Sequence, residues 1–337
     1  MRQRRIAIVG ATGLVGQEVL RVLEQRNFPV GELRLLASDR SVGKKIVFRD
    51  QELSVEATTA KAFDGMDFAF FAAGGDVSKE YAPIAAEAGA LVIDKSGTFR
   101  MEPDVPLVVP EVNLDDAKAH KGIIASPNCS TIQLVVAMNP LHQRNRIKHM
   151  TVATYQSVSG SGREAVEELN DQAERVLHGK PVAPHFYPHQ IAFNVLPQCD
   201  NFLDDGDTQE EWKLIHETRK IMHEPALRIG ATCVRVPVVV GHSEAVHVEF
   251  TRYLSPEDAR HILVESPGVK VLDDPVVALY PYPWMASGQD EVFVGRIRPD
   301  DSLTNGLALW VVSDNLRKGA ALNAVQIAEE VLRRGWL

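Results

Sequence analysis

The chain has 337 residues, of which 45% are hydrophobic and 24% charged, and its formal net charge is −9 at pH 7. This length suits two domains, and the composition is that of a globular protein. The negative balance argues against nucleic acid or an anionic membrane surface as the main partner, and no stretch is apolar enough to span a bilayer. We therefore expect small-molecule substrates, and an anionic one would need a local cluster of Arg or Lys.

Cysteine usage indicates the compartment. The three cysteines, Cys129, Cys199 and Cys233, stand far apart, and no C-x-x-C pair occurs. This spacing argues against a disulfide framework and a zinc site, so we expect no metal and a reducing, cytoplasmic location. The start MRQRR before an apolar run superficially resembles a signal peptide, but the glycines that follow and Glu18 argue against one.

The first 125 residues alternate between strand and helix patterns. Short β-branched or aromatic runs predict buried strands, and apolar residues at helical spacing predict helices between them. The strands are expected at residues 4–10, 33–38, 68–73 and 91–96, and the helices at residues 11–26 and 77–90. This order predicts a Rossmann-type, doubly wound parallel sheet.

A glycine motif joins the first strand to the first helix. Gly10, Gly13 and Gly16 form G-x-x-G-x-x-G, which allows a tight turn, a close approach of backbone to a pyrophosphate and close packing of helix on strand. The helix N-terminus adds N–H donors and positive potential. The motif therefore predicts a dinucleotide site, with plain turn glycines as the alternative.

The end of the second strand indicates which dinucleotide binds. An NAD site usually places an acidic residue there for the ribose 2′-OH. Here a 2′-phosphate can be bound by Ser38, Arg40 and Ser41, which favours NADP. Asp39 lies among them and favours NAD, and a solvated loop charge is the alternative for Arg40.

The stretch IIASPNCSTIQLVVAM, residues 123–138, places a cysteine between a proline turn and an apolar run. A helix that begins here carries Cys129 at or next to its N-terminus, where unpaired N–H groups and the helix dipole favour a thiolate. Cys129 is therefore a candidate nucleophile, and a small buried residue is the alternative. Cys199 and Cys233 are expected to be structural.

After the Cys129 helix the pattern changes to longer strands with more antiparallel character. Strands are expected at residues 149–160, 231–241, 245–254, 291–298 and 306–314, and helices at residues 163–179 and 321–334. The polar residues 200–212 predict a loop that enters a helix. A second α+β domain with a mixed sheet is therefore expected over residues 130–314.

Arg235 and His242 lie seven residues apart in RVPVVVGHSE. An arginine among valines needs an anion to justify its burial, and its planar fork suits a carboxylate. Histidine is the natural proton carrier near neutral pH, although a satisfied loop histidine is the alternative for His242 alone. With Cys129 and a nicotinamide cofactor, the set can add a thiolate to an aldehyde, move a proton and transfer a hydride.

These motifs together resemble the aspartate-β-semialdehyde dehydrogenases over nearly the whole chain. The matching segments, in order, are GATGLVG, SDRSVGK, GTFRM, SPNCST, YQSVSGSG, EEWK, RVPVVVGHSE and DNLRKGAALNA. The resemblance implies reversible conversion of L-aspartate-β-semialdehyde, phosphate and NADP+ to L-aspartyl-β-phosphate and NADPH, a step towards lysine, methionine and threonine. It also implies a homodimer joined through the second domain.

By this resemblance, each site residue receives a role. Cys129 is the nucleophile, His242 the acid/base and Gln156 the residue that orients the intermediate. Arg235 binds the carboxylate of the substrate, and Glu210 binds its ammonium. The residues of the phosphate pocket are Arg100, Asn128 and Lys213. The expected cofactor site comprises Gly10, Thr12, Gly13, Leu14, Val15, Gly16, Ser38, Arg40, Ser41, Ala73, Gly74, Ser159, Gly160 and Asn315.

Asn315 is expected near the nicotinamide, so the C-terminal segment returns to the first domain. The predicted domains are therefore 1–129 with 315–337, and 130–314. The alternative activity is that of an N-acetyl-γ-glutamyl-phosphate reductase. The Glu210 and Lys213 pair argues against it, because an acetylated amine is uncharged and cannot form an ion pair. A catalytically silent NADP-binding regulator is the alternative of another class.

Overall fold

The computed structural model describes residues 2–337, which divide into two compact units. Of the described residues, the first unit comprises residues 2–128 and 320–337, and the second comprises residues 129–319. The predicted boundaries stood at residues 129 and 315, so the contact boundaries differ from them by one and five residues. None of the helices in residues 2–337 combines the length and the apolar character that a bilayer crossing needs.

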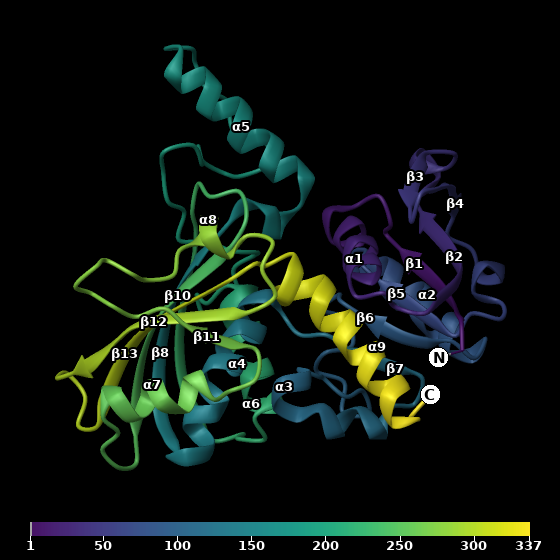
Figure 1. Ribbon diagram of the computed structural model, residues 1–337. Coiled ribbons are helices and arrows are strands. Elements are labelled where there is room, and N and C mark those ends of the chain that lie inside the picture. The colour runs from purple at the N-terminus through teal and green to yellow at the C-terminus, as the bar shows by residue number, and fades with distance from the viewer. Residues whose placement is uncertain (1) are drawn as a thin grey trace. The chain divides into compact units, whose positions relative to one another are not determined.

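The first unit is built on a seven-stranded sheet of order β3-β4-β2-β1-β5-β6-β7, parallel except for β3, which pairs antiparallel with β4 (Figure 1). Its strands are β1 (Arg4–Val9), β2 (Val30–Ala37), β3 (Lys45–Phe48), β4 (Gln51–Ala57), β5 (Phe68–Phe71), β6 (Leu91–Asp94) and β7 (Ile123–Ala125). Its α-helices are α1 (Leu14–Gln25), α2 (Gly75–Glu87), α3 (Pro110–Asn113) and α9 (Leu322–Arg334). The predicted doubly wound parallel sheet is confirmed.

Helices cover both faces of this sheet. Ile6 and Ile8 of β1 lie in a core with apolar residues of α1 and α9, whereas Ala7 and Val9 lie in a separate core with α2. Successive strand residues point to opposite faces, so a run of apolar residues is what a strand covered on both sides needs. The apolar run of β1, predicted to be a buried strand, fits this place between β2 and β5.

The hairpin of β3 and β4 was missed from the sequence. Its turn residues, Arg49 and Asp50, adopt positive φ values of 47° and 62°. Two-residue hairpin turns favour Asn and Gly in this region, so Arg-Asp carries no turn signal. The hairpin extends the parallel sheet at the β4 edge.

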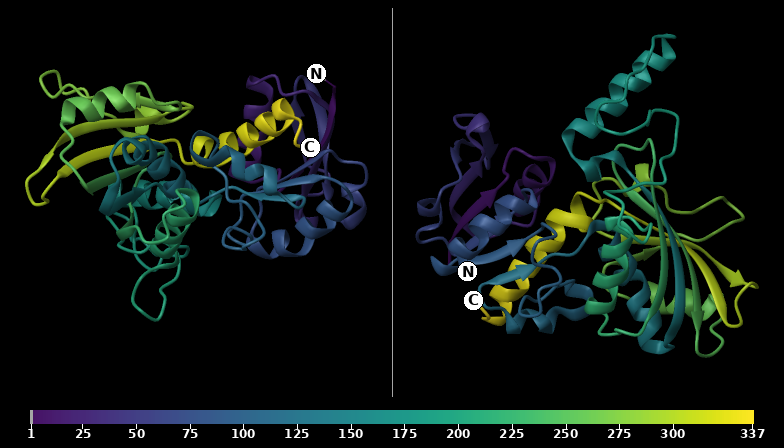
Figure 2. Two further views of the ribbon diagram at one scale, coloured as in Figure 1. Left: turned by 90° about the horizontal axis from the view of Figure 1, so that it is seen from below. Right: turned by 180° about the vertical axis from the view of Figure 1, so that it is seen from behind.

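The second unit contains a six-stranded mixed sheet, drawn in teal, green and yellow in Figure 2. The strand order is β11-β12-β13-β10-β8-β9. Its strands are β8 (Ile147–Gln156), β9 (Arg228–Arg235), β10 (His242–Phe250), β11 (Val269–Val271), β12 (Val292–Asp300) and β13 (Gly306–Ser313). Its α-helices are α4 (Cys129–Arg144), α5 (Arg163–Leu177), α6 (Gln209–Ile221), α7 (Pro256–Val264) and α8 (Pro283–Ala286). The predicted mixed sheet is confirmed, since β8–β9 and β11–β12 pair parallel and the other pairs are antiparallel.

Residues 236–241 form a connection between β9 and β10 and not the strand that was expected. The valine-rich run was predicted to continue the strand, but β9 ends at Arg235 and the next six residues form no strand. The chain turns at Gly241, whose φ is 97°, and β10 begins at His242. Pro237 has no N–H to donate, and the N–H of Val238 bonds back to the carbonyl of Val236 at 2.8 Å, so the ladder of the edge strand β9 does not continue. The run is a connection that places Arg235 and His242 at facing strand ends.

Candidate active site

The glycine motif of the first unit forms a turn in which two positions accept only glycine. A Cβ at Gly10, whose φ is 82°, would lie 2.5 Å from the carbonyl oxygen of Ala72, and a Cβ at Gly16 would lie 2.2 Å from that of Gly10. Gly13 is the N-cap of α1. The turn leads into the N-terminus of α1. Strand β2 lies on one side of β1 and β5 on the other, and a dinucleotide usually binds at the carboxyl end of the strand where the strand order reverses.

The other predicted cofactor residues of this unit lie at the carboxyl ends of neighbouring strands. Ser38 follows β2, and Ala73 and Gly74 follow β5 and lead into α2. The hydroxyl of Thr12 donates to that of Ser41 at 3.5 Å, which ties the glycine turn to the segment after β2. Leu14 and Val15 begin α1, and Arg40 is exposed beside Ser41.

Arg100 holds the backbone that leads to the nucleophile. Its buried guanidinium donates to the carbonyl oxygens of Ser126 at 3.0 Å and Lys95 at 2.7 Å. The ammonium of Lys95 donates to the carbonyl of Pro127 at 2.8 Å. Two cations therefore fix the SPN segment, whose last residue is the buried Asn128. Lys95 was missed from the sequence because a lysine after a strand carries no signal of its backbone contact.

Cys129 is the first residue of α4 and is partly exposed. A Cβ at Gly319 would lie 2.9 Å from the Cβ of Cys129, so the backbone of Gly319, within the π-helical turn of residues 317–321, packs directly against Cys129. Such π turns often mark functional sites. The N-terminal place of Cys129 favours its thiolate, as the sequence predicted.

Gln156, the last residue of β8, connects the nucleophile's helix to α6. Its side-chain amide donates to the hydroxyl of Ser130 at 2.7 Å and to the carboxylate of Glu210 at 3.2 Å. Lys213, one turn along α6, lies 3.4 Å from the same carboxylate and 2.6 Å from that of Asp200. The structure therefore brings Gln156, Glu210 and Lys213 together beside the residue that follows Cys129.

Arg235 ends β9 as a buried cation. One guanidinium nitrogen donates to the carbonyl of Ser157 at 2.8 Å, but its Nε–H finds no acceptor in residues 2–337. Cys129 and Glu210 are among its electrostatic neighbours. A buried donor without a partner is costly, so this guanidinium is suited to a bound carboxylate.

Gly160 separates Arg235 from His242. A Cβ at this glycine would lie 3.1 Å from both the guanidinium and Nε2 of the imidazole. A side chain at this position would contact both the guanidinium and the imidazole too closely, so the glycine keeps the space next to these two groups free. The residue was predicted for cofactor binding, and that role stays a prediction.

His242 begins β10 and is fully buried. The backbone N–H of Ser157 donates to its Nδ1 at 3.0 Å. An accepting Nδ1 assigns the proton of the neutral ring to Nε2, the nitrogen that faces Gly160. His242 therefore presents a donor to the same space that Arg235 borders.

Asn315 holds the turn that carries Ser157. Its amide oxygen accepts from Gly241 N–H at 2.8 Å, and from the hydroxyls of Ser157 and Ser159 at 3.0 and 3.3 Å. Its amide nitrogen donates to Ser159 at 3.0 Å. Asn315 lies in the second unit and fixes the geometry around His242, a role that its predicted place near the nicotinamide did not include.

Within the second unit, the arrangement combines a helix-capped thiol, a proton donor, a buried guanidinium and a carboxylate. Such a set can hold an amino acid by its charged ends and expose an acyl or aldehyde carbon to the thiol. Ser157, Ser130 and Asp200 were missed from the sequence. Ser157 and Ser130 flank predicted residues, and proximity along the chain was the only available signal.

Comparisons with known proteins agree with this chemistry. The chain matches the family described as "Semialdehyde dehydrogenase, NAD binding domain" over residues 5–120, and "Semialdehyde dehydrogenase, dimerisation domain" over residues 138–318. It is 55% identical to the aspartate-semialdehyde dehydrogenase of Aquifex aeolicus, over 98% of each chain. It superposes on the crystal structure of aspartate semialdehyde dehydrogenase II complexed with ASA, from Vibrio cholerae, with a TM-score of 0.96, 46% identity and 99% of each chain covered. The aspartate semialdehyde dehydrogenase with NADP from Candida albicans has a TM-score of 0.78 and 26% identity, over 99% of this chain and 100% of that one.

The cysteines should differ sharply in reactivity. Burial raises the pKa of the Cys199 thiol to about 12 and that of Cys233 well above its ordinary value, so both are almost wholly protonated at pH 8. Iodoacetamide reacts with thiolates, and Cys129 should therefore be alkylated at least tenfold faster than either, as peptide mapping over time will measure. Equal labelling of the three cysteines in the folded protein would contradict the assignment of Cys129 as nucleophile.

Proposed function

The chain belongs to the aspartate-semialdehyde dehydrogenase family, and on that premise we propose that it interconverts L-aspartyl-β-phosphate and L-aspartate-β-semialdehyde with NADP, in the branch that leads to lysine, methionine and threonine. The observation that carries this proposal is the Gln156 amide, which joins Ser130 beside the nucleophile to Glu210. Only the Gln156 side chain then lies between the residue next to Cys129 and the Glu210 carboxylate, which can bind the α-ammonium of a substrate. The buried Arg235 supplies the matching partner for the α-carboxylate.

In the direction of aldehyde oxidation, the Cys129 thiolate adds to the aldehyde carbon and the carbonyl oxygen becomes negative. His242 donates its Nε2–H to this oxygen as a hydrogen bond, and the N-terminus of α4 adds positive potential. The bound nicotinamide supplies the hydride acceptor, or the hydride donor in reverse. Phosphate oxygen then attacks the thioester carbon, and the C–S bond breaks to return the thiolate.

In the first unit, Arg100 and Asn128 are the residues that we propose to bind the phosphate, and the part of Lys213 in the second unit stays a prediction. Arg100 donates to backbone carbonyls of the segment before Cys129, so it both shapes this segment and brings a cation to it. An acidic protein can bind an anion in this way because the charge is local. The roles of these residues are part of the proposal.

Purified protein offered aspartate semialdehyde with NADP+ should reduce the cofactor only when phosphate is present. N-acetylglutamate semialdehyde, offered in parallel, tests the reductase alternative and should react at least a hundredfold more slowly, because its acylated amine cannot meet Glu210. No phosphate-dependent reduction with either aldehyde would leave a silent NADP-binding protein. Preference for the acetylated aldehyde would replace the proposed substrate.

Preference for NADP over NAD rests on the segment after β2. Arg40 is exposed beside Ser41, whose hydroxyl contacts Thr12 of the glycine turn, so its guanidinium can reach a 2′-phosphate on a ribose bound there. Asp39 begins the same short turn and is the residue that would favour NAD. We propose that the arginine dominates, since a charge-assisted contact contributes about 1.5 to 3 kcal/mol.

Arg40→Ala should therefore weaken NADP binding by about ten- to a hundredfold and leave NAD binding nearly unchanged. Dissociation constants measured by fluorescence quenching or calorimetry give both values on one preparation. Lys121→Ala, at another exposed cation of the first unit, serves as the control and should change neither. Equal losses for the two cofactors would remove Arg40 from the 2′-phosphate.

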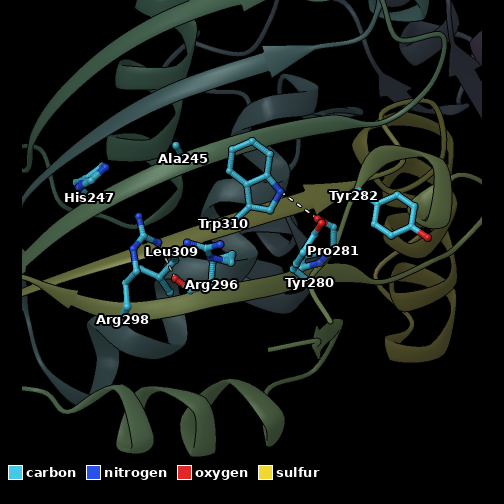
Figure 3. A pocket seen from close by; sticks show the side chains of 9 residues that line it. All are labelled: Ala245, His247, Tyr280, Pro281, Tyr282, Arg296, Arg298, Leu309 and Trp310. Atoms are coloured by element: carbon cyan, nitrogen blue, oxygen red, sulfur yellow. Dashed lines mark hydrogen bonds between the residues drawn. The ribbon is translucent and has the colours of Figure 1, made fainter. Parts of the chain in front are cut away.

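We also propose that the protein is a homodimer joined through the sheet face opposite α4. This face carries a cavity of about 380 Å³, and neither Arg296 nor Arg298 on its wall forms an ion pair in residues 2–337 (Figure 3). The adjoining loop exposes Val276 at 91%, and α8 exposes Trp284 at 87%. The residues that line the cavity are Ala245, His247, Tyr280, Pro281, Tyr282, Arg296, Arg298, Leu309 and Trp310.

A thiolate enzyme of this kind would work in the reducing cytoplasm.

Light scattering should then give twice the 37.2 kDa chain mass for the wild type. The double variant Val276→Asp with Trp284→Ala should shift the mass towards the monomer, because buried charge and lost apolar area both oppose association. Val264→Asp, on the exposed side of α7, serves as the control and should remain dimeric. A wild-type monomer would overturn the dimer proposal.

A further inference from the structure

Asp200 lies in the loop before α6 in a conformation that few aspartates adopt. Its φ is 70°, in the left-handed region. Its carboxylate accepts the N–H of Asn201 at 3.0 Å, and its carbonyl accepts from the Gln198 amide at 3.2 Å. The backbone and one carboxylate oxygen are thereby fixed, so the position of the other oxygen is determined by the loop.

That second oxygen forms an ion pair with Lys213 at 2.6 Å, and the same ammonium lies 3.4 Å from Glu210. The side chains of Asp200, Lys213 and Glu210 are 34%, 24% and 10% exposed. Two carboxylates thus bracket one ammonium, which gives the group a net charge of −1. Because this group is partly exposed, solvent reduces the strength of each pair without changing the sign of the total.

The sign of this charge matters for the ligand. A Glu210–Lys213 pair alone is neutral and would attract an ammonium weakly. Glu211 also carries a negative charge, and its carboxylate accepts the N–H groups of Thr208 and Cys233. Asp200 forms the shorter of the two ion pairs with Lys213 and adds one negative charge to the group of Asp200, Lys213 and Glu210.

Arg235 supplies the opposite charge, and Glu210 is among its electrostatic neighbours. The site then presents one positive charge and a group of charge −1, which matches an amino acid with a free ammonium and a carboxylate. Without Asp200 the Glu210 and Lys213 pair would be neutral and the site would be more positive by one charge, which favours a ligand that lacks the ammonium. Electrostatic complementarity of this kind determines selectivity more than affinity.

We propose that Asp200 is a specificity-determining residue, which makes the α6 group negative and so selects substrates with a free α-ammonium over acylated or deaminated ones. The inference rests on the proposed function. It also predicts an effect of opposite sign on phosphate, because Asp200 neutralises part of the Lys213 charge that an anion would use.

Asp200→Asn tests this directly. Asparagine tolerates the left-handed conformation and keeps the bond to the Asn201 N–H, so the loop is conserved while the charge is removed. The KM for aspartate semialdehyde should rise about three- to tenfold with little change in kcat, whereas the KM for phosphate should fall. Succinate semialdehyde, which has the same chain without the ammonium, should bind unchanged or more tightly.

Succinate semialdehyde is followed as a substrate or, where its turnover is too slow, as a competitive inhibitor. Asp200→Gly is the second variant and should give the same pattern, and Asp204→Asn, at an exposed aspartate of the same loop, should give none of it. A loss shared by both aldehydes and phosphate would assign Asp200 a structural role and overturn the inference. So would unchanged constants in both variants, and wild-type inactivity towards aspartate semialdehyde would instead contradict the proposed function itself.

Discussion

One hydrogen bond, from the backbone N–H of Ser157 to Nδ1 of His242, determines how the second unit can act on a substrate. A histidine at a strand end could present either nitrogen, but a backbone N–H can only donate, so Nδ1 must accept and Nε2 keeps the proton. Three other features serve this bond. Asn315 holds Ser157 and Gly241 together, and Gly160 leaves the space next to Nε2 open. The turn at Gly241 then starts β10 with His242 at its first position.

The charges of the site follow from the same framework. Arg235 ends β9 with one guanidinium nitrogen on the carbonyl of Ser157, so the residue that orients the imidazole also orients the guanidinium. Gln156 lies just before that residue and spans from the nucleophile's helix to α6. Two consecutive positions, Gln156 and Ser157, therefore organise groups from four different elements, α4, α6, β9 and β10. A shift of the β8 end by even about 1 Å would misplace them together.

Much of this was predictable from the sequence, and the limits have physical causes. The parallel sheet followed from apolar runs buried on both faces, and the start of α4 at Cys129 followed from a proline turn before an apolar helix. The hairpin at Arg49 and Asp50 was missed because its left-handed turn has Arg where such turns favour Asn or Asp, and Asp where they favour Gly. The continuation of β9 through Pro237 was wrong because valine-rich composition was weighted above the missing proline N–H.

Site residues were predictable where a motif marks them and not where only contacts do. Cys129, Arg235 and His242 stand in unusual surroundings along the chain, so their chemistry was visible. Lys95, Ser157 and Asp200 act through backbone groups or ion pairs with residues 13 to 85 positions away, and a single sequence does not report these contacts. Asn315 was singled out, but its contacts with Ser157, Ser159 and Gly241 could be found only in the structure.

The most direct test concerns the proton on His242. Nitrogen NMR of protein labelled with 15N-histidine reports the tautomer of each ring, and His242→Gln identifies the signal by its loss among the 11 histidines. At neutral pH the account predicts a single neutral tautomer with the proton on Nε2 and an unprotonated, accepting Nδ1. A proton on Nδ1, or an equal mixture of the two tautomers, would contradict the orientation on which the proposed chemistry depends.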